Sequence, residues 1–279
     1  MKVAARPFRN AQDSIEYCHN LGVDTAILEC NQIPGWAEKG YLEPGNISAA
    51  LKILNKGGIS CSVLVSETVP VIGRNPQDNE ILQNTVKTIH AMGEAGVPTL
   101  LLFMLEEIKE GADRETLWPF FINHHRYVVS AAAEADVNIA MHGYFPPIGL
   151  VDGNAFFARS FAELSDIHNG ICYDPGIMAI CGDNPLEGLE AFRERIHMVH
   201  IRDVNGDWRS VEDTKRDALQ LEVFPGKGIA KVESVMRRLY ETGYQGVVQP
   251  EHLGPPSEAE LLPAAIKYLQ DLIGRFEKG

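Results

Sequence analysis

One phrase recurs four times along this chain: a helical pattern ends at a glycine, and a short apolar run begins a few residues later. It reads NLGVDTAIL at 20–28, NKGGISCSVLV at 55–65, EAGVPTLLLF at 94–103 and ETGYQGVVQ at 241–249. Glycine supplies the left-handed conformation that closes a helix, and the apolar run after it is the next strand. Repeated helix-to-strand turns of this kind predict a parallel sheet.

Eight such apolar runs alternate with segments of helical period. The predicted strands are Val3–Arg6, Thr25–Glu29, Ser60–Ser66, Thr99–Met104, Asn138–His142, Gly170–Asp174, Met198–Ile201 and Val247–Pro250. The clearest predicted helices are Asn79–Ala95, Glu115–Ala135, Pro185–Ile196 and Ala230–Thr242. The length of 279 residues is close to the ~250 typical of a closed (β/α)8 barrel. We therefore expect one (β/α)8 TIM barrel domain spanning residues 1–279, with a doubly wound open sheet as the competing fold.

Composition excludes several classes of partner. The net charge is −13 and no lysine-arginine cluster stands out, so a nucleic-acid partner is not expected. The longest apolar stretches, such as Leu100–Leu105, fall far short of the ~20 residues that span a bilayer. The start, MKVAARPF, lacks the apolar core of a signal peptide, and the five cysteines are scattered. These features predict a soluble cytoplasmic protein with reduced thiols and no membrane partner, and they leave a homo-oligomer open.

The ends of the predicted strands carry the candidate site, because active sites of such barrels lie at the carboxyl ends of the strands. Four consecutive strands finish with a side chain able to bind a metal: His142, Asp174, His200 and Glu251. Each strand contributes one of them, so they would converge at the barrel mouth. Other strand-end candidates are Arg6, Glu29, Glu67, Glu106 and Glu107. Acidic residues also favour the first turns of helices, which is the simpler explanation for these four glutamates.

Two imidazoles and two carboxylates suit Mn²⁺, Zn²⁺, Co²⁺ or Fe²⁺ better than Ca²⁺, which prefers oxygen ligands throughout. Side chains alternate between the two faces of a strand, so His200 and Arg202 would point into the barrel and His197 would not. Any one of these residues alone is more often a cap or a surface group. Four on successive strand ends favour a site for a divalent metal, most simply Mn²⁺.

Several stretches resemble a known family: IAMHGYFPP, ICYDPG, RIHMVHIRDV and EVFPGKGIAKVESVMRRLYETGYQGVVQPEHL. The arrangement is similar to the xylose-isomerase-like TIM-barrel superfamily of sugar isomerases and epimerases, and within it to the mannonate dehydratases. That resemblance implies metal ligands at His142, Asp174, His200 and Glu251. It also implies that His252 acts as the acid or base and that Arg202 contacts the substrate. Asp174 stands where the dehydratases have cysteine, and Glu251 stands where they have aspartate.

Other polar and aromatic residues are weaker candidates. Tyr144 and Trp208 follow predicted strands and could shield a substrate, while Arg6 and Lys227 could hold an anionic group. Lys227 belongs to the glycine-rich turn FPGKG, which is as consistent with a plain loop as with an anion cradle. The adjacent His124 and His125 lie inside a helical pattern and are expected to be structural.

The metal site together with the resemblance to mannonate dehydratases implies a divalent-metal-dependent sugar-acid dehydratase, which would abstract a proton next to a metal-chelated oxygen and then expel water. A metal-dependent isomerase or epimerase of sugars or keto sugars is the alternative, and it would need two carboxylates on opposite sides of the substrate. A third hypothesis dispenses with metal and lets Arg6, Arg202 and Lys227 hold an anionic substrate. A related nuclease is disfavoured by the acidic charge.

Overall fold

The structure is a computed structural model of the whole chain. It describes residues 1–104, 112–144, 149–211, 218–254 and 257–278. Within these residues, no helix combines the length and the apolar character needed to cross a membrane.

Eight parallel strands form the barrel. They are β1 (Lys2–Val3), β2 (Thr25–Glu29), β3 (Ser60–Val65), β4 (Thr99–Leu102), β5 (Asn138–His142), β6 (Asn169–Tyr173), β7 (Ile196–Ile201) and β10 (Val247–Pro250). They are hydrogen-bonded in the order β1-β10-β7-β6-β5-β4-β3-β2. The two ends of this sheet meet through a parallel bridge between Ala5 and Ala26. Through this bridge the sheet forms a nearly closed barrel. The alternative of a doubly wound fold is therefore wrong, because its sheet would stay open.

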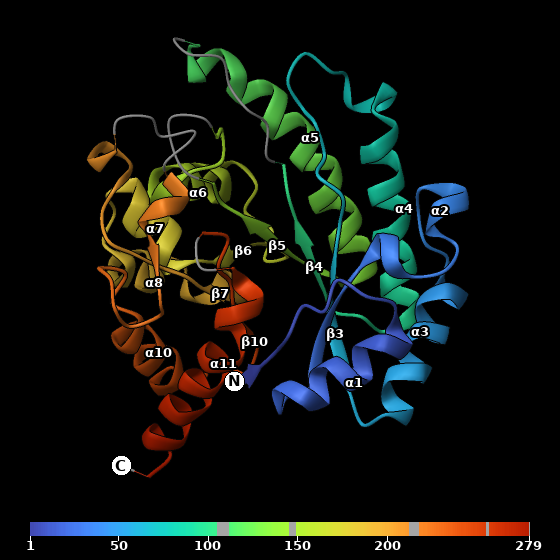
Figure 1. The fold of residues 1–279 in the computed structure, drawn as a ribbon. Coiled ribbons are helices and arrows are strands. Elements are labelled where there is room, and N and C mark those ends of the chain that lie inside the picture. The colour runs from blue at the N-terminus through green and yellow to red at the C-terminus, as the bar shows by residue number, and fades with distance from the viewer. Residues whose placement is uncertain (105–111, 145–148, 212–217, 255–256, 279) are drawn as a thin grey trace.

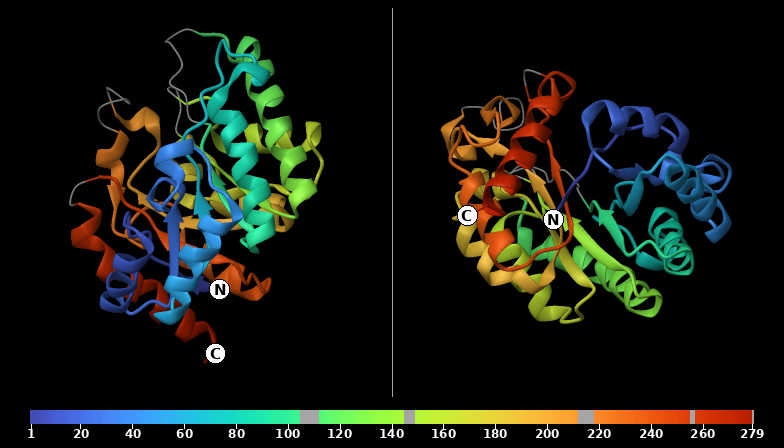
Figure 2. Two further views of the ribbon diagram at one scale, coloured as in Figure 1. Left: turned by 90° about the vertical axis from the view of Figure 1, so that its right-hand side faces the viewer. Right: turned by 90° about the horizontal axis from the view of Figure 1, so that it is seen from below.

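Helices surround the strands. They are α1 (Ala11–Leu21), α2 (Trp36–Lys39), α3 (Pro44–Lys56), α4 (Glu80–Ala95), α5 (Arg114–Ala135), α6 (Gly153–Glu163), α7 (Pro175–Cys181), α8 (Pro185–Phe192), α10 (Val232–Glu241) and α11 (Glu258–Phe276). Figure 1 shows α1 to α5 on one side of the strands and α6 to α11 on the other. The view from below in Figure 2 shows that the helices enclose the strands as a ring.

The glycine turns behave as the sequence predicts. Gly22 closes α1 with φ of 68°, and Gly96 closes α4 with φ of 76°. Both are in the left-handed region that favours glycine, and each is followed within three residues by a strand. The recurring phrase is therefore a series of helix-to-strand turns at the amino-terminal end of the barrel.

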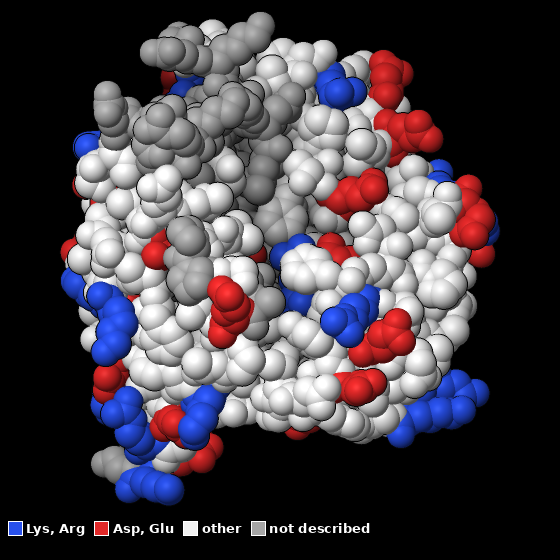
Figure 3. Space-filling model, in the orientation of Figure 1, with Lys and Arg blue, Asp and Glu red and all other residues white. Residues whose placement is uncertain are grey.

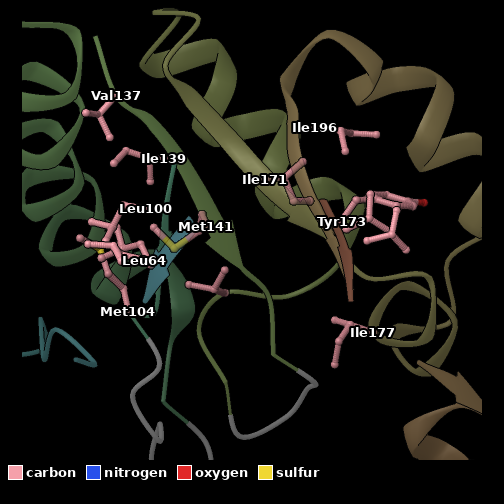
Figure 4. Packing of buried hydrophobic residues seen from close by; sticks show 14 of the residues in the cluster. Leu64, Leu100, Met104, Val137, Ile139, Met141, Ile171, Tyr173, Ile177 and Ile196 are labelled. Carbon is pink, nitrogen blue, oxygen red and sulfur yellow. The ribbon is translucent and has the colours of Figure 1, made fainter. Parts of the chain in front are cut away.

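The core has two layers, because alternate residues of each strand face opposite ways. A small inner cluster fills the barrel and consists of Ala4, Ile27, Val63, Val65, Leu101, Ala140, Cys172, Met198 and Val247. A larger cluster fills the space between strands and helices; Figure 4 shows part of it, including Leu64, Leu100, Ile139 and Ile171. Met198 lies in the inner cluster, whereas Val199 and Ile201 lie in the outer one, so His200 faces the barrel interior.

The predicted elements correspond closely to the observed ones, with differences at their ends. The first strand, predicted as Val3–Arg6, is Lys2–Val3, and the chain after it stays extended to the bridge at Ala5. The helix predicted to reach Ile196 ends at Phe192 and continues as a short 3-10 helix. The sequence did not predict a two-stranded antiparallel ribbon of β8 (Asp203–Val204) and β9 (Glu222–Val223), which lies outside the barrel.

Candidate metal centre

The four strand-end side chains proposed as metal ligands lie together. His142 ends β5, Asp174 follows β6, His200 is on β7 and Glu251 follows β10. Each offers one ligand atom, and these four atoms all lie within 4.8 Å of one another. All four residues are buried. A divalent ion could therefore take a ligand from each of four neighbouring strands.

Strand pairing explains this convergence. His142 is paired with Cys172 on β6, and His200 is paired with Gln249 on β10, so the four side chains come from adjacent strands at similar heights. Asp174 is fixed by a second device, since it is the N-cap residue of α7. Its Oδ1 accepts hydrogen bonds from the backbone amides of Gly176 and Ile177, at 2.8 and 3.0 Å. That leaves Oδ2 for the site.

The two imidazoles lack hydrogen-bond partners within the described part of the chain. Both ring nitrogens of His142 and both of His200 are buried without one. Their nearest charged neighbours are the carboxylates: His200 Nδ1 is 3.0 Å from Glu251 Oε2, and His142 Nε2 is 3.5 Å from Glu251 Oε2 and 3.7 Å from Asp174 Oδ2. Buried polar atoms without partners cost free energy, and a bound cation would satisfy these nitrogens. The donor set therefore fits a divalent metal ion.

The electrostatics keep both carboxylates ionised. Burial by itself raises the pKa of Glu251. The opposite effects of His200 and Arg202 outweigh burial, so the pKa lies well below its ordinary value. Burial likewise opposes ionisation of Asp174, but Arg202 and His142 outweigh it and lower its pKa. Two buried carboxylates that stay charged are the form in which oxygen ligands bind a cation.

The two histidines differ. Burial lowers the pKa of His200 and favours the neutral imidazole, which offers a lone pair to a metal. For His142, burial also acts to lower the pKa, but the neighbouring Asp174 and Glu251 carboxylates raise it overall. A proton on His142 and a cation in the site would therefore compete for the same negative charge.

Cys172 offers a second, softer donor set. Its sulfur forms a candidate group with His142 and His200, all three within 4.8 Å. Burial, with Asp174 and Glu251 nearby, raises the pKa of the Cys172 thiol well above its ordinary value. Metals bind the thiolate rather than the thiol, so the set with two carboxylates is the better one for a divalent ion.

Arg202 joins the two carboxylate ligands. Its Nε lies 3.1 Å from Asp174 Oδ2, and its Nη2 lies 2.5 Å from Glu251 Oε2. Its Nη1 donates to a third carboxylate, Glu222. Each guanidinium nitrogen thus meets a buried carboxylate. Burial by itself lowers the pKa of Arg202, but the carboxylates together outweigh this effect and raise it above its already high value. Arg202 is fixed as a partner of the candidate ligands.

Arg6 is likewise committed to carboxylates. It forms an ion pair with Glu29 at the end of β2, and its Nη1 lies 3.7 Å from Glu251 Oε1. Its guanidinium also lies over the ring of Phe103, 5.8 Å from the centroid. The metal-free hypothesis needed Arg6 and Arg202 to be available for an anionic substrate, and these pairings weaken it.

His252 is buried beside the site, and within the described part of the chain only one of its two ring nitrogens lies close to a charged side chain. Its Nδ1 is 3.4 Å from Glu222 Oε2, while its Nε2 is buried without a hydrogen-bond partner in the described residues. Together with Glu251 it lines a small cavity of about 10 Å³, closed by Leu261 and Leu262 of α11. A cavity of this size has room for about one water molecule.

The remaining predicted residues are more distant from the cluster in their contacts. Tyr144 is half-buried and its backbone amide donates to Val151, 2.6 Å away. Trp208 is half-buried beneath Arg209. Lys227 is exposed on the loop after β9. Glu67 is exposed, whereas Glu106 and Glu107 lie outside the described residues.

The FPGKG loop already holds a carboxylate of the chain itself. Asp203 accepts hydrogen bonds from the backbone amides of Gly226, Gly228 and Ala230, each at 2.9 Å. These amides are therefore not available to cradle an external anion. The loop is an internal cap on the β8–β9 ribbon.

The paired histidines of α5 are structural, as expected. His124 Nδ1 contacts the backbone oxygen of Phe120 at 2.7 Å, and His125 Nε2 contacts Asn169 Oδ1 at 2.7 Å. Both are buried. Glu222 was not among the residues predicted from the sequence, because nothing in the residues around it shows that the β8–β9 ribbon places it against Arg202.

Barrel and site together define a class: a TIM barrel with a cluster of candidate metal ligands at the carboxyl ends of its strands. The model of the family described as xylose isomerase-like TIM barrel matches residues 15–272. The chain belongs to this family.

Two kinds of dehydratase are similar to part of the sequence. A mannonate dehydratase from Halalkalibacterium halodurans is 26% identical over 159 residues, 53% of this chain and 41% of that protein. An inosose dehydratase from Clostridium tetani is 30% identical over 110 residues, 36% of this chain and 37% of that protein. The chain thus spans about two fifths of the length of the relatives it matches.

Solved structures share the fold over nearly the whole chain. A mannonate dehydratase from Streptococcus suis has a TM-score of 0.75 at 17% identity, covering 100% of this chain and 94% of that one. The IOLI protein with a bound zinc atom has a TM-score of 0.72 at 17% identity, with 99% and 98% covered. A 3-keto-D-glucoside 4-epimerase from E. coli has a TM-score of 0.71 at 18% identity, with 97% and 99% covered.

Proposed function

We propose that this chain is a divalent-metal-dependent carbohydrate lyase that removes water from a small polyhydroxylated substrate, in the first place a sugar acid. One observation carries the proposal: four buried candidate ligands from neighbouring strands meet at the barrel mouth, and two of them are imidazoles without hydrogen-bond partners among the described residues. The partial sequence similarity to mannonate and inosose dehydratases supports dehydration in particular.

His142, Asp174, His200 and Glu251 would hold the ion. When bound, a divalent ion polarises substrate oxygens and lowers the pKa of an attached hydroxyl or water. Mixed nitrogen and oxygen ligands suit Mn²⁺, with Co²⁺, Fe²⁺ or Zn²⁺ as alternatives, and one structure with the same fold contains zinc.

The residues around the ligands would have separate tasks. We assign proton transfer to Nε2 of His252, which has no hydrogen-bond partner among the described residues, because the other nitrogen of this ring already faces Glu222. We assign Arg202 to holding the carboxylates of Asp174 and Glu251, since all three of its nitrogens meet carboxylates. Arg6, Tyr144 and Lys227 remain proposed substrate contacts.

An isomerase or epimerase is the second candidate. It needs carboxylates on two sides of the substrate, and Arg6 pairs with two, Glu29 on the end strand β2 and Glu251 after β10, which is next to the other end strand. Both of these carboxylates are already paired, however, which favours dehydration.

The test combines metal loading with product analysis. Protein loaded with Mn²⁺ or Co²⁺ is incubated with D-mannonate, an inosose and a set of keto sugars, and the products are followed by mass spectrometry and NMR. Loss of one water molecule from a substrate supports the lyase, whereas a product of unchanged mass supports the second candidate. Turnover that survives complete removal of metal by a chelator would exclude both.

A further inference from the structure

Glu222 is a buried carboxylate that lies between Arg202 and His252. It belongs to β9, in the ribbon outside the barrel, and its side chain is only 1% exposed. β9 is held against β8, which follows the strand that carries His200: Val204 pairs with Glu222, and the amide of Asn205 donates to the backbone oxygen of Leu221 at 2.8 Å. The backbone hydrogen bonds of the ribbon therefore hold Glu222 in place.

The two oxygens of Glu222 have different partners. Oε1 accepts a hydrogen bond from Nη1 of Arg202. Oε2 accepts hydrogen bonds from the amides of Leu253 and Gly254, at 2.5 and 2.8 Å, and lies 3.4 Å from Nδ1 of His252. One side chain thus binds both Arg202 and the segment that follows Glu251.

These contacts lead to the candidate metal ligands. Arg202 contacts the ligand carboxylates of Asp174 and Glu251, and the chain held by Oε2 begins directly after Glu251. Partners that orient the ligands of a metal site tune its affinity, and their loss typically costs 10- to 100-fold in affinity or activity.

We propose that Glu222 is a positioning residue of the metal centre: it sets Arg202 against the two carboxylate ligands and orients the ring of His252. This inference rests on the proposed function, since it requires the cluster to bind an ion. Glu222 acts through Arg202 and His252 and touches no ligand of the ion.

The charges explain why the role needs a carboxylate. Arg202 is buried among three carboxylates, and two of them are candidate ligands. Without the charge of Glu222, the guanidinium would be balanced by Asp174 and Glu251 alone. Its positive charge would then oppose a cation at those two carboxylates more strongly, because interactions between buried charges are screened little.

Glu222→Gln separates this role from a merely structural one. The amide oxygen of glutamine can still accept from Leu253 and Gly254, so the segment stays anchored. Its amide nitrogen would face Arg202, donor against donor, and the charge is lost. Glu222→Asp keeps the charge on a shorter side chain and serves as the conservative variant.

The matched control is Glu163→Gln. Glu163 also pairs with an arginine, Arg159, and accepts a hydrogen bond from Trp118 at 2.8 Å, but it lies on α6 and has no contact with the cluster. It removes the same charge from an arginine-paired glutamate elsewhere in the fold.

The experiment titrates Co²⁺ into the full-length proteins and follows its visible absorption, with circular dichroism to check folding. We expect Glu222→Gln to bind Co²⁺ about 10- to 100-fold more weakly, Glu222→Asp to recover part of the loss, and Glu163→Gln to bind like the wild type. Affinity of a folded Glu222→Gln protein within twofold of the wild type overturns the inference alone. If that variant does not fold, Glu222→Asp decides, and wild-type affinity in it overturns the inference. A wild-type protein that takes up no Co²⁺ overturns the proposed function and this inference together.

Discussion

Nδ1 of His200 lies 3.0 Å from Oε2 of Glu251, although the two residues come from distant parts of the sequence and meet only because β7 pairs with β10. Neither ring nitrogen of His200 has a hydrogen-bond partner among the described residues. This arrangement supports the proposal that His200 is a metal ligand.

Removing His200 should therefore remove the metal. We expect the protein to hold about one Mn, Co, Fe or Zn ion per chain and His200→Ala to lose most of it, because each lost ligand weakens a four-ligand site strongly. Elemental analysis of the two purified proteins measures this directly. The control is His197→Ala on the same strand, whose ring faces the other way and contacts the backbone of Ile167 at 3.0 Å. Equal metal content in all three proteins would rule out His200 as a ligand.

Asp174 allows its two tasks to be separated. Its Oδ1 caps α7, while its Oδ2 faces His142 and Arg202. Asp174→Asn should retain the cap and lose metal affinity, because asparagine caps helices about as well as aspartate but carries no charge. Asp174→Ala should lose the metal and also about 1 kcal/mol of stability through the missing cap. Urea unfolding of the metal-free proteins, beside a metal titration, tests both statements. Equal metal binding by Asp174→Asn and the wild type would exclude the ligand role.

The sequence was sufficient for the barrel and for finding four side chains that lie together at its mouth, and the reason is local. Four strands follow a helix-closing glycine turn, such as the one at Gly96, and four consecutive strands end at or near one polar residue such as His142. Because parallel strands align their carboxyl ends, finding the strands also found the residues that meet.

The contacts around the ligands could not be predicted in the same way. Arg202 pointed inward as expected from strand alternation, but its partner Glu222 arrives on a ribbon of two-residue strands, which leave almost no periodic pattern. The turn FPGKG was as consistent with a plain loop as with an anion cradle, and only the fold shows that Asp203 accepts hydrogen bonds from its amides. Pairings of this kind depend on which loops pack together, and a single sequence does not state that.

Acid should destabilise the fold through buried His125. Burial lowers its pKa to about 4 from the ordinary value of 6.5. The unfolded chain therefore binds a proton that the folded chain refuses as pH falls below 6.5, so stability is intact above that pH and is lost progressively down to pH 4. The loss attributable to this residue is about 3 kcal/mol.

Urea unfolding of the metal-free protein at pH 7.5 and 4.5 measures this loss. His125→Gln, which does not titrate, should show a smaller difference between the two pH values. His90→Gln on α4 is the control, because the side chain of His90 is 42% exposed and meets solvent before and after unfolding. A His125→Gln protein with the full wild-type difference would mean that other groups cause the acid sensitivity.

Helix packing around the barrel gives a prediction independent of any metal. A Cβ atom at Gly93, in α4, would lie 2.3 Å from the backbone oxygen of Ala135 and 3.0 Å from its Cβ, where α4 packs against α5. Because a backbone atom cannot rotate away, Gly93→Ala should push the helices apart and cost about 1–3 kcal/mol. At Gly274, in α11, none of the described residues outside its own stretch of helix has an atom within 4 Å of the same position. Gly274→Ala should therefore stabilise the protein by up to about 1 kcal/mol, since alanine is the better helix former. Urea unfolding curves compare the three proteins, and stabilisation by both substitutions would contradict the close approach of α4 and α5.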